Sequence, residues 1–195
     1  MHHVGRRQSQ NPFAGKLKGE VQRVAFHPSK PVLFTATKTH VLVYHLVKQT
    51  LIKKLGSGVK WISSIAVHPG GDNVVIGSFD RRVCWFDLDL SSKPYKTLKY
   101  HDRAVRHSSF HAKYPLMASA SDDGAVHIFH ARVYDDLMRN ALIVPVKSLK
   151  AHAPTDGLGV LDCAWHPSQP WLFSAGADGI VRLWQNIHGS TAPPL

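Results

Sequence analysis

The sequence contains few of the residues that define several large classes of protein. Only two of its 195 residues are cysteines, Cys84 and Cys163, which is too few for a disulfide framework and typical of reduced core positions. Charged residues make up 19% of the chain, fewer than in charge-rich disordered proteins. No apolar run reaches the length of about 18 residues that a transmembrane helix needs, and residues 1–18 lack the apolar stretch of a secretory signal. We therefore expect a reduced, intracellular globular protein with no membrane partner.

Acidic residues are also scarce, and they are unevenly distributed. Lys and Arg total 24 against 13 Asp and Glu, and Glu20 is the only glutamate. The first 60 residues hold eleven Lys and Arg against this single acid, whereas the rest of the chain holds thirteen against twelve. A basic N-terminal third indicates a polyanionic partner, most often nucleic acid. The alternative is a basic face that serves only solubility.

The common signatures of nucleotide binding and metal-dependent catalysis are absent as well. The chain has no GxxxxGK loop followed by Ser or Thr, no GxGxxG turn and no HExxH helix. We therefore predict that the chain is not an enzyme, takes no cofactor and has no small-molecule substrate.

The chain does contain a fourfold internal repeat. Four short apolar stretches, at periods of 41, 43 and 55 residues, each end in a histidine: His27, His68, His111 and His166. A turn residue follows 11 or 12 positions later, namely Lys38, Asp80, Asp123 or Asp178. Six positions after it, an aromatic residue closes the next stretch, namely Tyr44, Phe86, Phe129 or Trp184. The first two periods match the roughly 40–45 residues of a four-stranded propeller blade.

Each repeat has the composition of β-strands. Segments rich in β-branched and aromatic residues predict third strands at Val41–Tyr44, Val83–Phe86, Val126–Phe129 and Val181–Trp184. Outer strands are predicted at Thr50–Leu55, Tyr95–Lys99 and Val146–Lys150. The third period is lengthened by Ala131–Val146, in which Val133–Asn140 is predicted to form a short helix. The predicted fold class is all-β, a β-propeller of about four four-stranded blades in an incomplete ring, with a short helical insert in the third repeat.

Some sets of residues in the repeats have the residue types that are found in active sites. His152, Ser174 and Asp178 are the residue types of a hydrolytic triad, but they occupy positions that recur between repeats, which favours structural hydrogen bonding. The repeated histidines at positions 27, 68 and 166 would lie on separate blades, whereas zinc ligands cluster at short spacing. We therefore predict no catalytic residue and no metal site.

Basic residues are better functional candidates. Besides Lys48, Lys53, Lys54 and Lys60 around the first outer strand, two groups are singled out. The first is an N-terminal arm with Arg6, Arg7, Lys16 and Lys18. The second has aromatic residues interleaved and consists of Lys93, Lys96, Lys99, Arg103 and Arg106. Such residues would neutralise RNA phosphates while the aromatic rings stack on unpaired bases. For the second group the alternative is a solvated outer strand whose lysines block edge pairing.

The repeats resemble those of the WD40 propeller. In that family a His, Ser, Asp and Trp form a hydrogen-bond network that ties the strands of one blade together. The last repeat carries the full set, His152, Ser174, Asp178 and Trp184, and the third repeat carries His101, Ser119, Asp123 and Phe129. The chain departs from the family pattern because it has no Trp-Asp dipeptide. It also has Lys38 in place of the turn aspartate of the first repeat, whose network is therefore predicted to be broken.

Longer stretches are more specific than generic WD40 sequence, and they include Lys60–Asn73, Trp85–Lys96, Val133–Leu137 and Gln169–Gly179. With them the chain, from Ser9 to Trp184, resembles the C-terminal propeller of the block-of-proliferation family of ribosome biogenesis factors. The resemblance implies a truncated member that acts as a non-enzymatic scaffold in the nucleolus and nucleoplasm. It would support maturation of the large (60S) ribosomal subunit and processing of its precursor RNA. The implied partners are the Pescadillo protein, a second WD-repeat protein and pre-ribosomal RNA. The alternative is a generic WD40 module that binds an acidic protein.

The repeats and the resemblance together predict a layout for the chain. Residues 1–18 are expected to be a basic arm that ends a preceding blade, residues 19–184 the partial propeller, and residues 185–195 a disordered tail. The repeats are expected at about 19–59, 60–102, 103–157 and 158–184. An arc of four blades would leave a blade face exposed, which favours association.

Overall fold

The computed structural model describes residues 13, 19–134, 136, 139–150 and 152–185, which contain fifteen β-strands and no helix. The strands form four antiparallel sheets in chain order, and we call each sheet a blade. Blade 1 consists of β1 (Val21–Phe26), β2 (Val32–Thr37), β3 (His40–His45) and β4 (Thr50–Gly56). Blade 2 consists of β5 (Ile62–Val67), β6 (Asn73–Ser78), β7 (Val83–Asp87) and β8 (Lys96–Leu98). Blade 3 consists of β9 (Val105–Phe110), β10 (Leu116–Ser121), β11 (Ala125–Arg132) and β12 (Leu142–Lys150). Blade 4 consists of β13 (Val160–Trp165), β14 (Leu172–Gly176) and β15 (Val181–Trp184).

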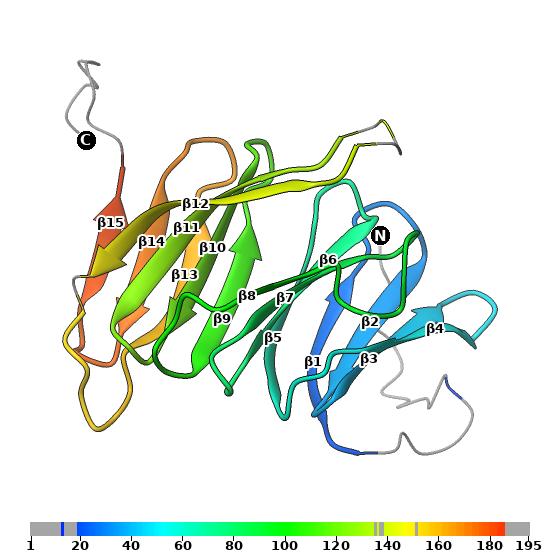
Figure 1. Cartoon of the computed structure of the whole chain (residues 1–195), viewed down its shortest axis with the longest axis horizontal. Coiled ribbons are helices and arrows are strands. Elements are labelled where there is room, and N and C mark those ends of the chain that lie inside the picture. The colour runs from blue at the N-terminus through cyan, green and yellow to red at the C-terminus, as the bar shows by residue number, and fades with distance from the viewer. Residues whose placement is uncertain (1–12, 14–18, 135, 137–138, 151, 186–195) are drawn as a thin grey trace, which may run out of the picture.

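The four blades stand side by side (Figure 1). Strand order within each blade follows the sequence, and the first strands, β1, β5, β9 and β13, contact one another in turn. This arrangement confirms the predicted all-β propeller with an incomplete ring. The predicted third strands lie at β3, β7, β11 and β15, and the predicted outer strands at β4, β8 and β12. Within the described residues, no helix is long and apolar enough to cross a membrane.

Apolar side chains between neighbouring blades hold the row together. One cluster joins blades 1 and 2 and includes Phe34 and Ile62, and a second joins blades 2 and 3 around Trp85 and Phe129. All four side chains are fully buried. A third cluster joins blades 3 and 4. Burial of one such large side chain contributes about 2–3 kcal/mol, so packing between blades is a main source of stability. Since an internal blade is covered on both faces, its strands show little alternation of polar and apolar residues.

The helix predicted in the third repeat is wrong for the described residues of the segment 133–140. Strands β11 and β12 instead continue as a long hairpin, paired as far as Arg132 and Leu142. Residues 133, 134, 136, 139 and 140 lie in its connection and are not helical, while 135, 137 and 138 lie outside the described residues. The strands continue because the cross-strand pair Ala131 and Ile143 is buried in the second cluster, against which Val133 also packs.

Candidate functional site

The last blade contains a continuous chain of hydrogen bonds. The indole Nε1 of Trp184 donates to the Ser174 hydroxyl at 2.8 Å, and that hydroxyl lies 2.7 Å from Nε2 of His152. Nδ1 of His152 lies 3.0 Å from a carboxylate oxygen of Asp178. Since the carboxylate only accepts, Nδ1 carries the imidazole proton and the serine donates to Nε2. The hydrogen bond from His152 and two backbone N–H groups lower the pKa of Asp178. The chain of bonds ties β14 and β15 to the segment that precedes β13.

Blade 3 repeats this arrangement with one member missing. His101 lies 2.8 Å from the Ser119 hydroxyl and 2.9 Å from the Asp123 carboxylate, but Phe129 has no donor in place of the indole. Burial alone would raise the pKa of Asp123. The hydrogen bonds from His101 and from the N–H groups of Ala125 and Asp102 outweigh burial and lower the pKa to about 2. Asp123 is therefore ionised throughout the neutral range.

These serines do not meet the requirements of a nucleophile. Ser174 is 1% exposed and Ser119 is 0% exposed, whereas a catalytic hydroxyl must reach its substrate. Both hydroxyls are also engaged with the histidine of their own blade. The geometry therefore gives the His, Ser and Asp residues of blades 3 and 4 the role of joining strands.

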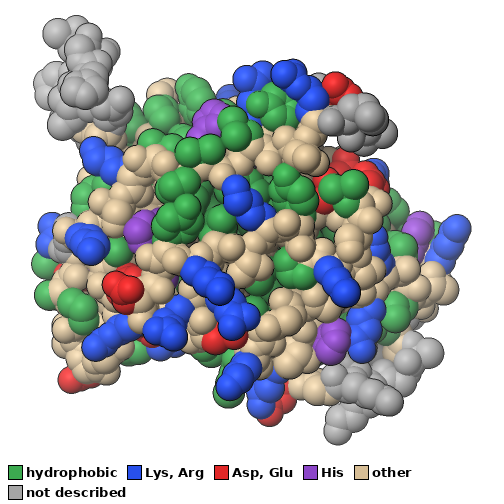
Figure 2. All heavy atoms as spheres, in the orientation of Figure 1, with side chains coloured by type: hydrophobic (Ala, Val, Ile, Leu, Met, Phe, Trp, Pro, Cys, Tyr) green, Lys and Arg blue, Asp and Glu red, His purple; other side chains and the backbone are tan. Residues whose placement is uncertain are grey.

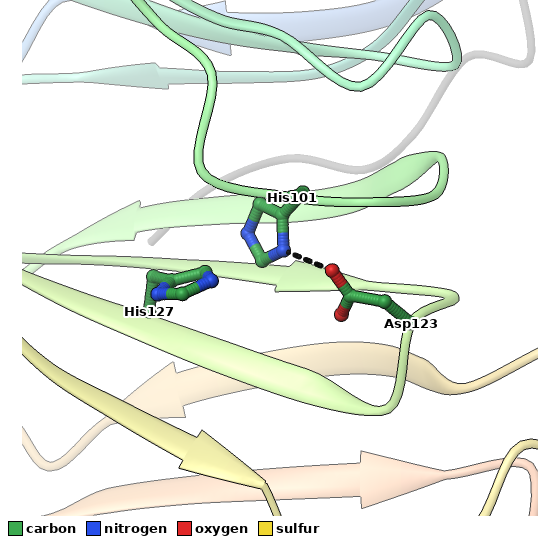
Figure 3. Close-up of side chains that lie close together, drawn as sticks. All are labelled: His101, Asp123 and His127. Atoms are coloured by element: carbon green, nitrogen blue, oxygen red, sulfur yellow. Dashed lines mark hydrogen bonds and ion pairs between the residues drawn. The ribbon is translucent and has the colours of Figure 1, made fainter.

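A second histidine, His127, lies beside the blade 3 network, and Figure 3 shows it next to His101, with the two rings inclined at 69° in an edge arrangement. The ring centroids of His101 and His127 are 4.4 Å apart, and each of the residues His101, Asp123 and His127 offers a ligand atom within 4.8 Å of the others. Burial, followed by the charge of His101, lowers the pKa of His127. Both ring nitrogens of His101 are already hydrogen-bonded, so a metal ion would have to replace the contact with Asp123 or Ser119. This trio fits a metal poorly, and the sequence analysis did not single it out.

The corresponding positions of blades 1 and 2 make other contacts. Lys38, which replaces the turn aspartate of blade 1, pairs with Glu20 at 3.1 Å, and its ammonium lies 4.5 Å from the ring centroid of Trp61 in blade 2. Asp80 of blade 2 accepts from the Ser78 hydroxyl. The only glutamate of the chain thus neutralises the lysine that interrupts the repeat.

The repeated turn histidines have a role that the sequence analysis missed. Nδ1 of His111 accepts hydrogen bonds from the N–H groups of Lys113 and Tyr114, at 2.9 and 3.0 Å, so Nε2 carries the proton. Nε2 then donates at 2.8 Å to the carbonyl of Gln169 in the next blade. No local sequence signal identifies this partner, because it lies 58 residues farther along the chain.

The structure divides the second predicted group of basic residues. Lys93, Lys99 and Arg103 are exposed around β8 and the loop before β9. Lys96 is exposed too, but its ammonium donates to the Ile143 carbonyl at 3.0 Å and so links β8 to the hairpin of blade 3. The four basic residues of the arm, Arg6, Arg7, Lys16 and Lys18, lie outside the described residues.

Arg106 is set apart from the other members of this group by its contacts. It pairs with the buried carboxylate of Asp122, at 2.7 Å from Nη2 and 2.8 Å from Nε. Its guanidinium also lies 4.9 Å from the ring centroid of Phe79. A fork-shaped pair with a buried carboxylate is a strong structural contact, so less of this charge is available to a ligand.

The long hairpin adds basic residues that the sequence analysis did not group with β8. Lys147 and Lys150 on β12 and Arg132 on β11 are exposed, and Lys96 joins them through Ile143. Figure 2 shows Lys and Arg side chains spread over most of one face of the molecule, with few acidic ones among them. The sequence would have indicated this basic surface only if β11 and β12 had been recognised as one continuous hairpin that brings the lysines of β12 beside β8.

Acidic residues gather in a cavity of about 530 Å³ between blade 2 and the tip of the hairpin. Asp72, Asp87 and Asp89 line its blade 2 side, and Tyr134 lines its hairpin side. Asp72 pairs with Lys30 at 3.1 Å, and Asp87 accepts from the N–H of Asp89 at 3.0 Å. The carboxylates of Asp72 and Asp87 are therefore already engaged in contacts within the protein.

The similarity of the chain to known proteins agrees with its propeller fold. The family model described as "WD domain, G-beta repeat" matches residues 49–87, 92–130 and 143–185. The chain is 59% identical over 184 residues to "Ribosome biogenesis protein BOP1 homolog" of Monosiga brevicollis, covering 94% of this chain and 23% of that protein. It is 59% identical over 189 residues to "Ribosome biogenesis protein ERB1" of Malassezia globosa, covering 94% and 22%. It is 59% identical over 184 residues to "Ribosome biogenesis protein bop1" of Danio rerio, covering 94% and 24%.

The chain therefore spans about a quarter of the length of these curated relatives. The similarity confirms the resemblance to the block-of-proliferation family that the longer sequence stretches indicated. With three repeats matched by the family model and four antiparallel blades in the fold, the chain belongs to the WD-repeat family.

Proposed function

We propose that the chain acts in ribosome biogenesis as a non-enzymatic scaffold that supports maturation of the large subunit and processing of its precursor RNA. The observation that carries this proposal is the identity of 56–59% over 94% of the chain to proteins named for ribosome biogenesis. The buried serines of the blade networks support a role without catalysis. The net charge of +11 supports contact with a polyanion.

In this proposal the RNA contacts lie on the surface around β8. Lys93, Lys99 and Arg103 carry exposed charge and have no buried ion-pair partner among the described residues, and Lys96 continues this surface toward the hairpin. Tyr100, which is 46% exposed, offers a ring for stacking on an unpaired base. The arm residues Arg6, Arg7, Lys16 and Lys18 complete the proposed set, in which Arg106 has the smallest share because it pairs with Asp122. Affinity would come from neutralised phosphates and released counterions.

The remaining parts of the proposal concern layout, partners and place. Residues 1–18 act as a basic arm, residues 19–184 as the scaffold, and residues 185–195 as a tail. The partners are the Pescadillo protein, a second WD-repeat protein and pre-ribosomal RNA, and the site of action is the nucleolus and nucleoplasm. The protein uses no cofactor, metal, membrane or small-molecule substrate.

Binding to fragments of precursor ribosomal RNA over a series of salt concentrations tests the RNA contacts. Replacing Lys93, Lys99 and Arg103 by Glu should weaken binding at least about tenfold and flatten the dependence on salt, because three phosphate contacts are lost. The matched control replaces Lys48, Lys54 and Lys113, which are equally charged and exposed but lie elsewhere on the surface. Equal loss of binding in both triple variants would contradict a localised RNA surface.

An acidic protein partner is the second candidate. The observation that favours it is the outer strand β12, where Leu142, Val144 and Val146 are 43%, 43% and 60% exposed beside Lys147. Mixed apolar and basic surface suits an acidic protein better than it suits RNA. Co-purification that survives nuclease treatment and is lost on replacing Val144 and Val146 by Ser would support this candidate. Loss on nuclease treatment would support RNA.

A further inference from the structure

Blade 2 exposes two neighbouring aromatic rings at one end of its strands. Trp61, directly before β5, is 40% exposed, and Phe79, directly after β6, is 36% exposed. The N–H of Phe79 donates to the Trp61 carbonyl at 3.0 Å, and the ring centroids lie 5.6 Å apart in an edge arrangement. Blades 1 and 3 pack on the two faces of blade 2, so these rings are exposed at the end of an internal blade rather than on an uncovered blade face.

The same backbone hydrogen bond identifies the equivalent positions in the next two blades. In blade 3 it runs from the N–H of Asp122 to the Ala104 carbonyl at 2.9 Å. In blade 4 it runs from the N–H of Ala177 to the Gly159 carbonyl at 2.8 Å. Neither pair contains an aromatic residue, so this end of a blade forms without large apolar side chains. The two rings of blade 2 are therefore not needed for strand pairing.

Side chains of the neighbouring blades hold the two rings in place. The ammonium of Lys38 in blade 1 lies 4.5 Å from the ring centroid of Trp61, whose Nε1 donates to the Gln22 side chain at 3.2 Å. The guanidinium of Arg106 in blade 3 lies 4.9 Å from the ring centroid of Phe79. A ring that is already held in position loses little conformational freedom when a ligand stacks on it. The pair is therefore a preorganised aromatic surface.

The turn that carries Phe79 holds an arginine in a strained backbone conformation. The N–H of Arg81 donates to the Ser78 carbonyl at 3.2 Å, and the glycines Gly124 and Gly179 make the equivalent bond in blades 3 and 4 at the same distance. Their φ angles are 79° and 76°, and Arg81 has a φ of 71°. Glycine adopts this left-handed conformation without steric cost, whereas a residue with a Cβ does not. An exposed arginine in a glycine position points to a function for its charge.

Unpaired cations lie around the rings. Lys60, Arg81 and Arg103 are exposed, and none of the three forms an ion pair with a described residue. Lys60 and Arg103 occupy equivalent positions, since each comes directly before the residue whose carbonyl accepts the backbone bond of its blade. Arg103 also belongs to the proposed RNA surface around β8. The basic surface therefore continues from the outer side of blades 2 and 3 to the end of blade 2 that carries the rings.

We propose that Trp61 and Phe79 form a stacking site for unpaired bases of single-stranded RNA, whose phosphates are neutralised by Lys60, Arg81 and Arg103. The inference rests on the proposed RNA contact and adds a second, aromatic part to it. Exposed rings beside a basic surface are the combination that binds single strands, because every base offers a face for stacking. Bases inside a duplex are already stacked on one another, so a duplex should gain nothing from the rings.

Fluorescence anisotropy with two labelled RNAs of mixed sequence, a single strand of about ten nucleotides and a duplex of the same length, tests the stacking site. Trp61→Ala should weaken binding of the single strand about tenfold and leave the affinity for the duplex unchanged. Trp61→Phe, which keeps a ring, should retain most of the affinity. Unchanged affinity of Trp61→Ala for the single strand, or equal losses for strand and duplex, would overturn the site.

The matched control is Tyr114→Ala. Tyr114 is 44% exposed, but it lies in the turn between β9 and β10, at the other end of the strands. Its replacement should leave the affinity for the single strand unchanged. A loss equal to that of Trp61→Ala would mean that exposed rings anywhere on the surface bind RNA, and would overturn a localised site.

Arg81→Gly tests the phosphate contact in a variant that should fold at least as well as the wild type. It removes the charge and restores the residue that blades 3 and 4 have in this conformation, so the unfolding temperature should not fall. Affinity for the single strand should nevertheless drop about three- to tenfold, and the dependence on salt should become flatter. Unchanged affinity would contradict the role of Arg81.

Two outcomes separate this site from the proposed function as a whole. Loss of RNA binding on replacing Lys93, Lys99 and Arg103 by Glu, with no loss in Trp61→Ala, would overturn the stacking site and leave the RNA surface around β8 standing. A wild-type chain that binds neither the single strand nor the duplex would overturn both. Capture of a protein partner that survives nuclease treatment and is lost in Trp61→Ala would assign the rings to a protein instead of RNA.

Discussion

The strands within blade 3 and within blade 4 are joined by a different means from the strands within blades 1 and 2. In blades 3 and 4 a buried histidine bridges a serine and an aspartate, so that a polar network joins the strands. In blade 1 the turn position holds Lys38, which pairs with an exposed glutamate and lies over an aromatic ring. All four blades nevertheless have the same strand order among the strands described. The comparison teaches that packing between blades specifies the fold and that the networks add stability to individual blades.

The largest expected effect comes from removing the centre of one network. His101→Ala leaves the Ser119 hydroxyl and the Asp123 carboxylate without their partner in a buried setting, so the free energy of unfolding should fall by about 3 kcal/mol. Urea unfolding monitored by circular dichroism measures this loss of unfolding free energy. The control is His45→Ala in blade 1, where the histidine is half-buried and accepts one backbone hydrogen bond. A cost for His101→Ala no larger than that of the control would show that the network contributes little.

The second effect is a dependence on pH. The pKa of Asp123 is about 2 in the folded protein and near 4 in an unfolded chain, so the unfolded state takes up the proton first as the pH falls. The carboxylate therefore contributes about 2 kcal/mol at pH 7, and this contribution is lost as the pH falls from about 5 toward 2. The difference in unfolding free energy between the wild type and Asp123→Asn should shrink over that range. A difference that stays constant with pH would contradict the assignment.

The third-largest effect is expected from a substitution that gives blade 4 the aromatic residue of blade 3. Trp184→Phe removes the indole that donates to Ser174 but keeps an aromatic ring, as at Phe129. The expected loss is about 1 kcal/mol, the usual net value of one hydrogen bond. Thermal unfolding of this variant beside Trp171→Phe, whose indole nitrogen makes no hydrogen bond to any described residue, separates the lost bond from the smaller ring. Equal losses in the two variants would mean that the bond to Ser174 contributes nothing.

The smallest effect is expected in blade 1. Lys38→Ala removes a pair with the largely exposed Glu20 and a contact over the Trp61 ring, so about 0.5–1 kcal/mol should be lost. High salt should remove part of this difference, since exposed charges are screened. A loss as large as that of His101→Ala would mean that Lys38 substitutes fully for a blade network, and the contrast between the blades would fail.

The sequence predicted the features that depend on local pattern. The third strands were predictable because β-branched and aromatic runs follow the turn residues at fixed spacing. The networks were predictable only through resemblance, because a histidine, a serine and an aspartate in sequence do not by themselves reveal which hydrogen bonds they make. His152 and Ser174, for example, are 22 residues apart and meet only when β13 and β14 pair.

The features that the sequence failed to predict depend on contacts between distant residues. The hairpin of β11 and β12 continues because Ala131 and Ile143 are buried against blade 2, and that burial cannot be read from their own segment. The sequence analysis placed Arg106 among the basic residues that could bind RNA, but the fold places the buried Asp122 beside it. The link from His111 to Gln169 crosses between blades in the same way.

The most direct test of the proposed function is sedimentation of the tagged chain in a nuclear extract. The account predicts that the chain sediments with precursors of the large ribosomal subunit, and that replacing Lys93, Lys99 and Arg103 by Glu shifts it toward the free-protein fractions. A wild-type chain found only in the free-protein fractions, apart from precursor ribosomal RNA, would contradict the proposed function.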